Sequence, residues 1–225
     1  MENCENSAIW GTYGNNHQGV CLKFRVDNEA NQPGISLHKP GINPQGLKWW
    51  TPTKFYFSKV SYSEKSPDLD FFCNIAAYAA QDVIKKWYTD KDGNISSRKK
   101  DVFENHQQWH AKHHSDNLKS LTVKTRHWSN EQEYRLILKS QFNSYVDEDD
   151  RKLRYSFDSL DGIIFGIKTP DSDKYKLIEM VEKMCKIRNR EEFTFYQSFY
   201  DSVDEAIRYR PVVHVGSNGV RAHKD

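Results

Sequence analysis

Glu131, Glu133 and Arg135 place two carboxylates and a guanidinium at every second position of the chain. The apolar residues of the alternating phase are Tyr134, Leu136 and Leu138. Successive side chains of a strand point to opposite faces, so this spacing predicts one strand with a charged face and a core face. A carboxylate beside a positive charge that develops in a reaction lowers its energy, which suits catalysis on a polar ligand. The alternative is a solvated strand face with weak ion pairs.

A glycine-rich stretch from Trp10 to Val20 has the composition of a ligand-binding turn. Its glycines let the backbone approach a ligand closely. Tyr13 offers a ring for stacking, and His17 offers an imidazole for hydrogen bonding. The alternative is an ordinary loop around a core tryptophan and a satisfied histidine.

A histidine-rich segment offers possible metal ligands. Its members follow one another at helical spacing: His106, His110, His113 and His114. Histidines at i and i+4 can bind a metal ion when a third ligand arrives. The sequence has no HExxH pattern, however, and lysines in the same segment would repel a cation. A solvated helix face without metal is therefore predicted.

Composition limits the class of protein. The chain has 225 residues, with 33 Lys and Arg against 31 Asp and Glu, so its net charge of +2 excludes a polyanion binder driven by bulk charge. Mean hydropathy is −0.86 and no long apolar run occurs, so no transmembrane helix and no membrane partner are expected. The start of the chain does not resemble a signal peptide. The cysteines form no CxxC pair: Cys4, Cys21, Cys73 and Cys185. Reduced thiols in a cytoplasmic protein are expected.

The hydrophobic periodicity predicts the elements that position these residues. The predicted strands are Val20–Val26, Lys54–Ser63, Leu121–Thr125, Glu133–Lys139, a segment marked by Leu153, Tyr155 and Phe157, Gly162–Lys168 and Phe193–Tyr200. The predicted helices are Asp68–Tyr88, a polar helix from Ser96 or Ser97 towards His114, and Lys174–Ile187 with Asp171 or Ser172 as its cap. Asp27–Pro52, rich in proline and glycine, is predicted to be a long connection, and the tail from Gly216 is predicted to fray.

These elements favour the α+β class. We expect a central, mostly antiparallel sheet with a helical insertion and a C-terminal packing helix. The expected organisation is a single domain over residues 1–225, with the helical insert at about residues 68–118.

Four separated blocks resemble a known bacterial family. They are Trp10-x-x-Tyr13-x-x-x-His17-x-Gly19-Val20-Cys21-Leu22-x-Phe24, Lys59-Val60-x-Tyr62, Lys124-x-x-x-Trp128-x-x-Glu131-x-Glu133-x-Arg135 and Ile163-Ile164-Phe165-Gly166. Their order resembles that of the bacterial domain-of-unknown-function family 2971. Members of that family usually carry a further N-terminal segment before the first block, whereas this sequence begins almost at the block.

A remoter similarity is to ADP-ribosyltransferases. In the order of those enzymes, His17 and Arg25 stand early, Ser61-Tyr62-Ser63 in the middle and Glu131-Gln132-Glu133 late. The resemblance implies NAD as a substrate. Glu133 would then stabilise a cationic ribose or orient a ribose hydroxyl, and Glu131 would position the acceptor. Tyr13 and His17 would hold the dinucleotide. Arg135 would fix a carboxylate or phosphate. Trp128, which belongs to the same family motif, would also bind the dinucleotide.

The resulting expectation is a cytoplasmic, NAD-using, ADP-ribosyltransferase-like enzyme that serves as a phage-defence effector or a toxin. Its partners would be a nucleotide-type small molecule and a macromolecular acceptor. One alternative is a non-catalytic nucleotide or nucleic-acid binding module, because the aromatic residues are interspersed with lysine and arginine. The aromatic residues in question are Trp49, Trp50, Tyr56, Trp109 and Trp128. The other is a metal-dependent nuclease or hydrolase built from Glu131, Glu133 and the histidine-rich helix.

Overall fold

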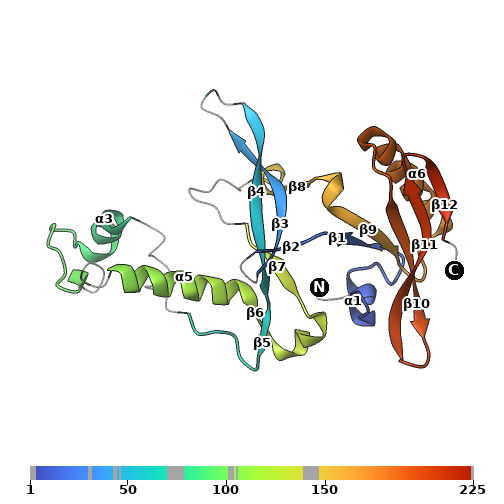
Figure 1. Cartoon of the computed structure of the whole chain (residues 1–225). Coiled ribbons are helices and arrows are strands. Elements are labelled where there is room, and N and C mark those ends of the chain that lie inside the picture. Colours follow the sequence, from blue (N-terminus) through green and yellow to red (C-terminus); the bar gives the residue numbers. More distant parts are fainter. Residues whose placement is uncertain are drawn as a thin grey trace. The chain divides into compact units, whose positions relative to one another are not determined.

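The computed structural model of the chain (Figure 1) describes residues 4–29, 32–42, 45, 47–69, 79–100, 104, 106–138 and 147–223. The chain divides into two compact units. Unit 1 comprises residues 1–58 and 130–225, and unit 2 comprises residues 59–129. The predicted insert at residues 68–118 falls within unit 2, and the prediction of a single domain stays a prediction. None of the helices in the described ranges has the length and apolar character that a bilayer span requires.

The first sheet of unit 1 has five strands in the order β1-β9-β10-β11-β12. Their bounds are Val20–Phe24, Leu160–Phe165, Phe193–Asp201, Ala206–Gly216 and Gly219–Ala222. All neighbours are antiparallel except β9 and β10, which pair in parallel, with Ile163 opposite Phe195. A parallel pair needs a crossover, and helix α6 (Asp171–Arg188) supplies it. The sheets are mostly antiparallel, which confirms the predicted α+β class.

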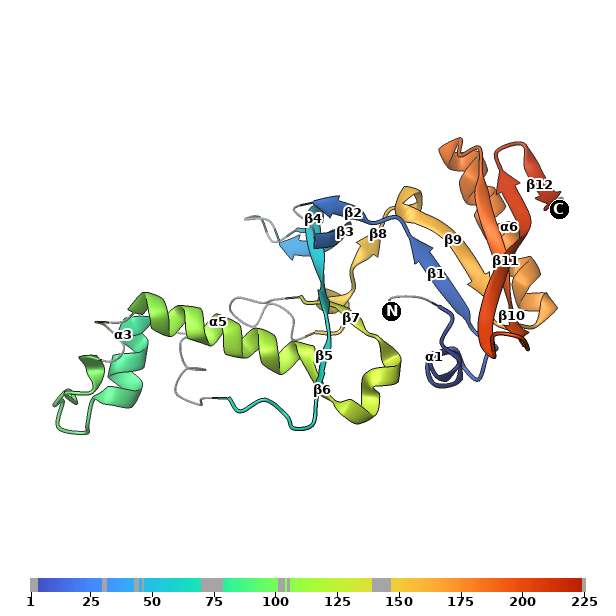
Figure 2. The ribbon, with the colours of Figure 1, turned by 60° about the horizontal axis from the view of Figure 1, so that its bottom comes forward.

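Helix α6 packs on this sheet and closes the main core (Figure 2). Val181 and Cys185 of α6 are buried in one cluster with Phe193, Phe195 and Val215. Burial of such large apolar side chains is the main driving force for folding. The prediction of a C-terminal packing helix is thus confirmed.

The ends of α6 follow helix capping rules. Its N-cap is Pro170 rather than the predicted Asp171 or Ser172, and the acidic residues Asp171 and Asp173 lie in its first turn. At the other end Asn189 adopts the left-handed conformation with φ 51° and terminates the helix. The chain turns there towards β10.

The second sheet of unit 1 corrects the predicted long connection over Asp27–Pro52. This segment forms β2 (Asp27–Glu29), β3 (Gln32–Ile42) and the first part of β4 (Lys48–Lys59). The sheet order is β2-β3-β4-β7, with β7 at Tyr134–Leu136, and β8 (Arg154–Tyr155) also pairs with β3. Proline does not break these strands. In an antiparallel pair only alternate residues use their N–H towards a given neighbour, so a strand tolerates proline at other positions.

Several boundaries in unit 1 also differ from prediction. The tail that was predicted to fray from Gly216 is paired over its described part, where Gly219–Ala222 forms β12 against β11. Phe157 lies in the 3-10 helix η5 (Phe157–Ser159) rather than in a strand, and β9 ends at Phe165 instead of Lys168. A sharp turn after Phe165 accounts for the latter, since Gly166 lies directly against the backbone of the N-terminal loop.

Unit 2 contains the parallel pair β5 (Ser61–Ser63) and β6 (Val123–Thr125), helix α3 (Ala80–Val83), the π-helix η2 (Ile84–Tyr88) and helix α5 (His106–Thr122). The predicted helix over Asp68–Tyr88 is present from Ala80, Asp68 and Leu69 are irregular, and residues 70–78 lie outside the described part. Helix α5 continues beyond His114 to Thr122, since no glycine or proline interrupts it. The predicted strand at Leu121 therefore begins only at Val123.

Candidate functional site

A pocket of about 250 Å³ in unit 1 brings together the two segments that the sequence singled out. It is lined by Ile9, Tyr13, Glu131 and Glu133. The Tyr13 hydroxyl donates a hydrogen bond of 2.8 Å to Glu131 Oε1, although the two residues are 118 positions apart. The N-terminal turn and the acidic segment therefore meet in one concavity.

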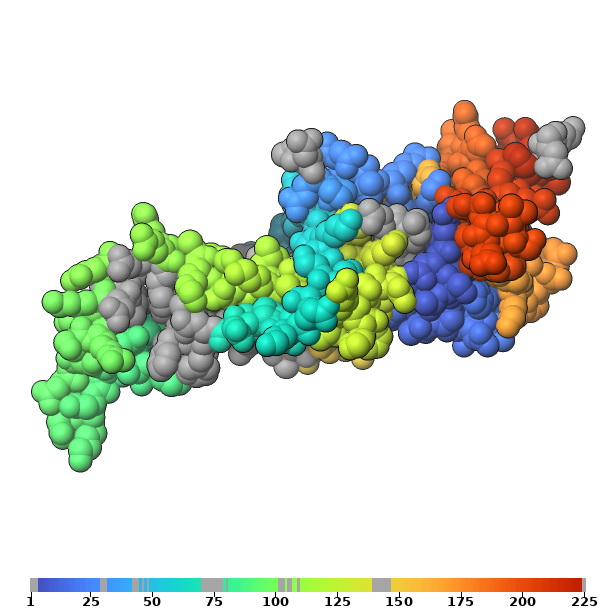
Figure 3. Space-filling model, turned by 90° about the horizontal axis from the view of Figure 1, so that it is seen from below, coloured from blue at the N-terminus to red at the C-terminus, as the bar shows by residue number. Residues whose placement is uncertain are grey.

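Helix α1 (Ser7–Thr12) presents Ile9 and Tyr13 to this pocket. Asn6 caps the helix by accepting a hydrogen bond of 2.9 Å from the Ala8 amide, and its side chain also donates to the Asn130 carbonyl. Trp10 is 3% exposed and packs with Ile164 and Ile207 of the first sheet. In the space-filling view, α1 and β1 (blue) lie beside the β10–β11 hairpin (red; Figure 3). The helix is thus fixed from its buried side, and Tyr13 remains at its exposed end.

The two carboxylates reach the pocket by a route that differs from the predicted strand face. Glu131 ends the 3-10 helix η3 (Arg126–Glu131), and β7 begins only at Tyr134. Between them Gln132 has φ 44°, the left-handed conformation, which reorients the chain. The prediction that Glu131 and Glu133 share one strand face is therefore wrong, because neither residue lies in β7, although both line the pocket.

Each carboxylate accepts a hydrogen bond from a nearby side chain. Glu131 is 9% exposed and bonded to Tyr13, which offsets part of the cost of burying it. Glu133 accepts two hydrogen bonds from Arg135, of 2.6 Å from Nε and 3.1 Å from Nη2. This forked pairing fixes the orientation of Glu133 and partly offsets its charge.

His17 has contacts of a structural kind. Its ring stacks on Trp10 with centroids 6.5 Å apart, and its carbonyl accepts from the Lys168 amide at 2.9 Å. Its Nδ1 is buried and has no hydrogen-bond partner among the described residues. The loop that contains it is pressed against Gly166, where a Cβ would lie 2.2 Å from the His17 oxygen. A part for His17 in holding a dinucleotide stays a prediction, and the observed role is to anchor the loop after α1.

Trp128 belongs to unit 2. It is 51% exposed, and the Lys124 ammonium lies 5.4 Å from its ring centroid. Ser61-Tyr62-Ser63 forms β5 of the same unit, paired with β6. The parts predicted for Trp128 and for the Ser-x-Ser segment in the Tyr13 pocket therefore stay predictions. The early Arg25 pairs with Asp161 at 3.1 Å and lines a different pocket.

Within the described ranges, no group of three or more His, Cys, Asp and Glu side chains could hold a metal ion. His110, His113 and His114 lie on α5, and Asp116 on the same helix is paired with Lys112. The predicted absence of metal remains a prediction, and the metal-dependent hydrolase gains no support from this part of the chain.

Ile9 lines the pocket but was not singled out from the sequence. Ile9 and Tyr13 stand at i and i+4, a spacing that indicates one face of a helix. Gly11 and Gly14 favour a loop over a helix, so the sequence predicts a turn where α1 forms.

Comparison with known proteins gives one match. The model of a family described as "Protein of unknown function (DUF2971)" matches residues 9–136, which is more than half of the chain. No curated protein and no solved structure matches.

Proposed function

The chain belongs to the family of proteins of unknown function DUF2971, and we propose that it transfers the ADP-ribosyl group of NAD in the pocket at Tyr13, Glu131 and Glu133. The observation that supports this proposal is the convergence of two oriented carboxylates, one buried, on a single small concavity. The proposal includes the cytoplasmic setting and the role of a phage-defence effector or toxin, for which consumption of NAD is a suitable activity.

Cleavage of the bond between ribose and nicotinamide in NAD is favoured by a nearby carboxylate. In NAD the bond between ribose C1′ and the nicotinamide nitrogen breaks, and its electron pair leaves with nicotinamide, which becomes neutral. The ribose passes through an oxocarbenium-like state, as in glycoside cleavage. An acceptor oxygen or nitrogen then bonds to C1′ and loses its proton. A carboxylate that is already oriented stabilises the cationic state without the cost of reorganisation.

The contacts suggest a role for each residue. Arg135 holds Glu133 by a fork, so Glu133 is oriented towards the pocket as the group that stabilises the cation or binds a ribose hydroxyl. Glu131, bonded to Tyr13, positions the acceptor. At about 250 Å³ the pocket is smaller than the usual ~300–1,000 Å³ of whole-ligand sites, so it suits the ribose and nicotinamide only. Tyr13 is 66% exposed and offers a ring to the rest of the dinucleotide.

The experiment measures nicotinamide released from NAD by the purified chain, with bacterial lysate as the source of acceptor. Glu133→Gln and Glu131→Gln should each lower the rate about 100-fold or more, the usual effect of removing an electrostatic group from a transition state. Glu179→Gln is the matched control, because Glu179 lies on α6 in an exposed pair with Lys183. Release that survives in the Glu131→Gln, Glu133→Gln double variant would exclude the proposal.

One observation favours a second candidate, a non-catalytic nucleotide-binding module. Arg135 offsets part of the charge of Glu133, and a carboxylate held in this way can also accept a hydrogen bond from a ligand hydroxyl without any catalysis. Calorimetric titration with NAD and ADP-ribose separates the two. Binding that Tyr13→Phe and Glu133→Gln weaken, without any nicotinamide release, would favour the binding module.

A further inference from the structure

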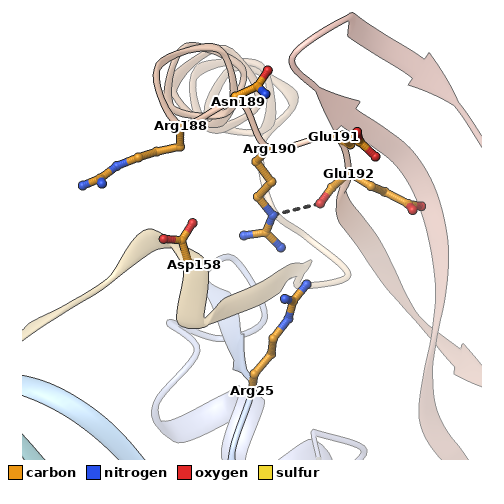
Figure 4. A pocket seen from close by; sticks show the side chains of 7 residues that line it. All are labelled: Arg25, Asp158, Arg188, Asn189, Arg190, Glu191 and Glu192. Carbon is orange, nitrogen blue, oxygen red and sulfur yellow. Dashed lines mark hydrogen bonds between the residues drawn. The ribbon is translucent and has the colours of Figure 1, made fainter.

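A second pocket of unit 1, of about 380 Å³, lies where α6 ends and β10 begins (Figure 4). Three arginines from two segments of the chain line it: Arg25, which follows β1, and Arg188 and Arg190, which flank Asn189. We infer that this pocket binds the phosphate group of a small phosphorylated molecule through these three guanidinium groups. The inference does not rest on the proposed function, because other residues line the pocket at Tyr13.

Arg190 is rigidly held at the base of the pocket. Its Nε donates to the Glu192 carbonyl at 2.8 Å, and one Nη donates to the carbonyls of Phe157 and Leu160 at 3.1 and 2.7 Å. Its guanidinium also lies over the rings of Phe157 and Phe193, 5.1 and 4.8 Å from their centroids. A guanidinium has five donors, so two N–H groups of Arg190 have no partner among the described residues. Both N–H groups belong to Nη2, which the other three hydrogen bonds hold in place, so they can donate to phosphate oxygens.

Positive charges face one another across this pocket. Figure 4 shows the side chains of Arg25 and Arg190 pointing towards each other. Burial, and then the charge of Arg25, lowers the pKa of Arg190. Arg25 shares the carboxylate of Asp161 with Lys23, so one anion serves two cations. Arg188 makes no ion pair with any residue that the structure describes. An anion between these groups would relieve their mutual repulsion.

The carboxylates of the lining do not cancel this charge. In Figure 4 the side chains of Glu191 and Glu192 point away from the guanidinium groups of Arg25 and Arg188, and Glu192 pairs with His214 at 3.1 Å. Asp158 alone faces the arginines, and it makes no ion pair within the described part of the chain. Three guanidinium groups therefore surround the pocket against one carboxylate that faces it.

Stabilisation of the C-terminal end of α6 does not explain the cluster. Basic residues in the last turn of a helix interact favourably with its carbonyls, and this accounts for Arg188. Arg25, however, follows β1 and is not part of α6. Arg190 donates hydrogen bonds to the carbonyls of Phe157, Leu160 and Glu192, none of which belongs to α6. The volume lies within the ~300–1,000 Å³ typical of small-molecule sites, so the ligand is a small phosphorylated compound.

Isothermal titration calorimetry of the full chain with inorganic pyrophosphate, at low and physiological salt, tests the inference. Pyrophosphate should bind more weakly as salt rises. Arg188→Gln and, independently, Arg25→Gln should weaken binding about 10-fold, the loss of one charge-assisted contact. Asp158→Asn should strengthen binding, because it removes the facing negative charge. Arg221→Gln is the matched control, because Arg221 is an exposed arginine on β12. This variant should bind pyrophosphate with the affinity of the wild type.

A second measurement localises the anion. In a ¹⁵N–¹H spectrum the Nε–H resonance of Arg190 should shift on addition of pyrophosphate, and that of Arg221 should not. Thermal melting shows which variants remain folded, and at least one of Arg188→Gln and Arg25→Gln must be folded for comparison with Arg221→Gln. Glu133→Gln should retain full affinity for pyrophosphate, so the two proposals fail separately. No binding by the wild type, or equal affinity of the folded arginine variants and Arg221→Gln, would overturn the inference.

Discussion

Asp161 illustrates how one side chain organises charge in unit 1. Lys23 and Arg25, on and after the same strand, both pair with it, at 2.9 and 3.1 Å. The hydrogen bond from Lys23, and then that from Arg25, holds the pKa of Asp161 below its usual range. The folded state therefore favours the ionised carboxylate more than the unfolded state does.

The pH dependence of stability follows from this difference. A depressed pKa in the folded state gives stability that is present above the unfolded value, 3.8, and is lost as pH falls through the folded value. Asp161→Asn should cost about 1 kcal/mol of the free energy of unfolding at pH 7, as for exposed ion pairs, and less at pH 3. Urea unfolding at both pH values measures this. Asp173→Asn, at an exposed pair with Lys176, serves as control. An equal cost at both pH values would contradict the expectation.

At the same scale the sequence predicted the site in part. The family resemblance placed Tyr13 and the acidic segment in one site, and the Tyr13–Glu131 hydrogen bond brings these residues together. The pairing of Glu133 with Arg135 was not predicted, because Arg135 was assigned to the ligand. The positive φ of Gln132 could not be read from the sequence, because tertiary contacts impose it on a residue with no special preference for it. A catalytic role for these residues stays a prediction.

At the scale of elements, the junction between β9 and the loop after α1 depends on a close backbone approach. A Cβ on Gly166 would lie 2.2 Å from the His17 oxygen and 2.9 Å from the Gly19 oxygen. The amides of Gly166 and Lys168 also donate to the Gly19 and His17 carbonyls. The only residue without a Cβ is therefore required where these two segments meet.

Gly166→Ala should destabilise the protein by about 2 kcal/mol or more, because backbone rather than a flexible side chain must move. Gly11→Ala is the matched control, since no atom lies within 4 Å of the added Cβ in helix α1. That substitution should be neutral or stabilise by up to about 1 kcal/mol, the difference in helix propensity. Thermal and urea unfolding measure both variants. Equal stability of the two variants would show that the backbone around Gly166 can move apart at little cost in free energy.

Elements with strong periodicity could be predicted, and those with mixed signals could not. The strand predicted over Phe193–Tyr200 and the helix predicted over Lys174–Ile187 match β10 and α6 closely, since each buries one clear face. The β3–β4 hairpin was missed because its pairing partners, such as Pro40 with Trp50, gain their stability from cross-strand contacts rather than local preference.

At the scale of the whole molecule, the two long helices differ in what they bury. Among the residues that the structure describes, apolar clusters form around Phe195, Trp10 and Ile35 in unit 1, and α6 contributes to the first of them. In unit 2 the described buried side chains of α5 are polar: His113, Asp116 and Thr122. Apolar burial supplies most of the free energy that opposes unfolding, so α5, whose described buried side chains are polar, should open more readily than α6.

Hydrogen exchange followed by mass spectrometry measures this difference. Amides of α5 should exchange well before those of α6, although the helices have nearly equal lengths of 17 and 18 residues. Helix α6 thus serves as the internal control, because Val181 and Cys185 bury it against the sheet. Equally slow exchange in both helices would mean that contacts other than apolar burial stabilise α5.

The antiparallel pairing of β1 with β9 has a consequence for synthesis on the ribosome. Val20 pairs with Phe165, so about 145 further residues must be translated before β1 can pair with β9. At roughly 5–20 residues per second, the nascent chain carries an unpaired strand for on the order of ten seconds. During that interval Val20, Leu22 and Phe24 are available to chaperones, whereas β9, α6, β10 and β11 emerge consecutively and can assemble as they leave the exit tunnel.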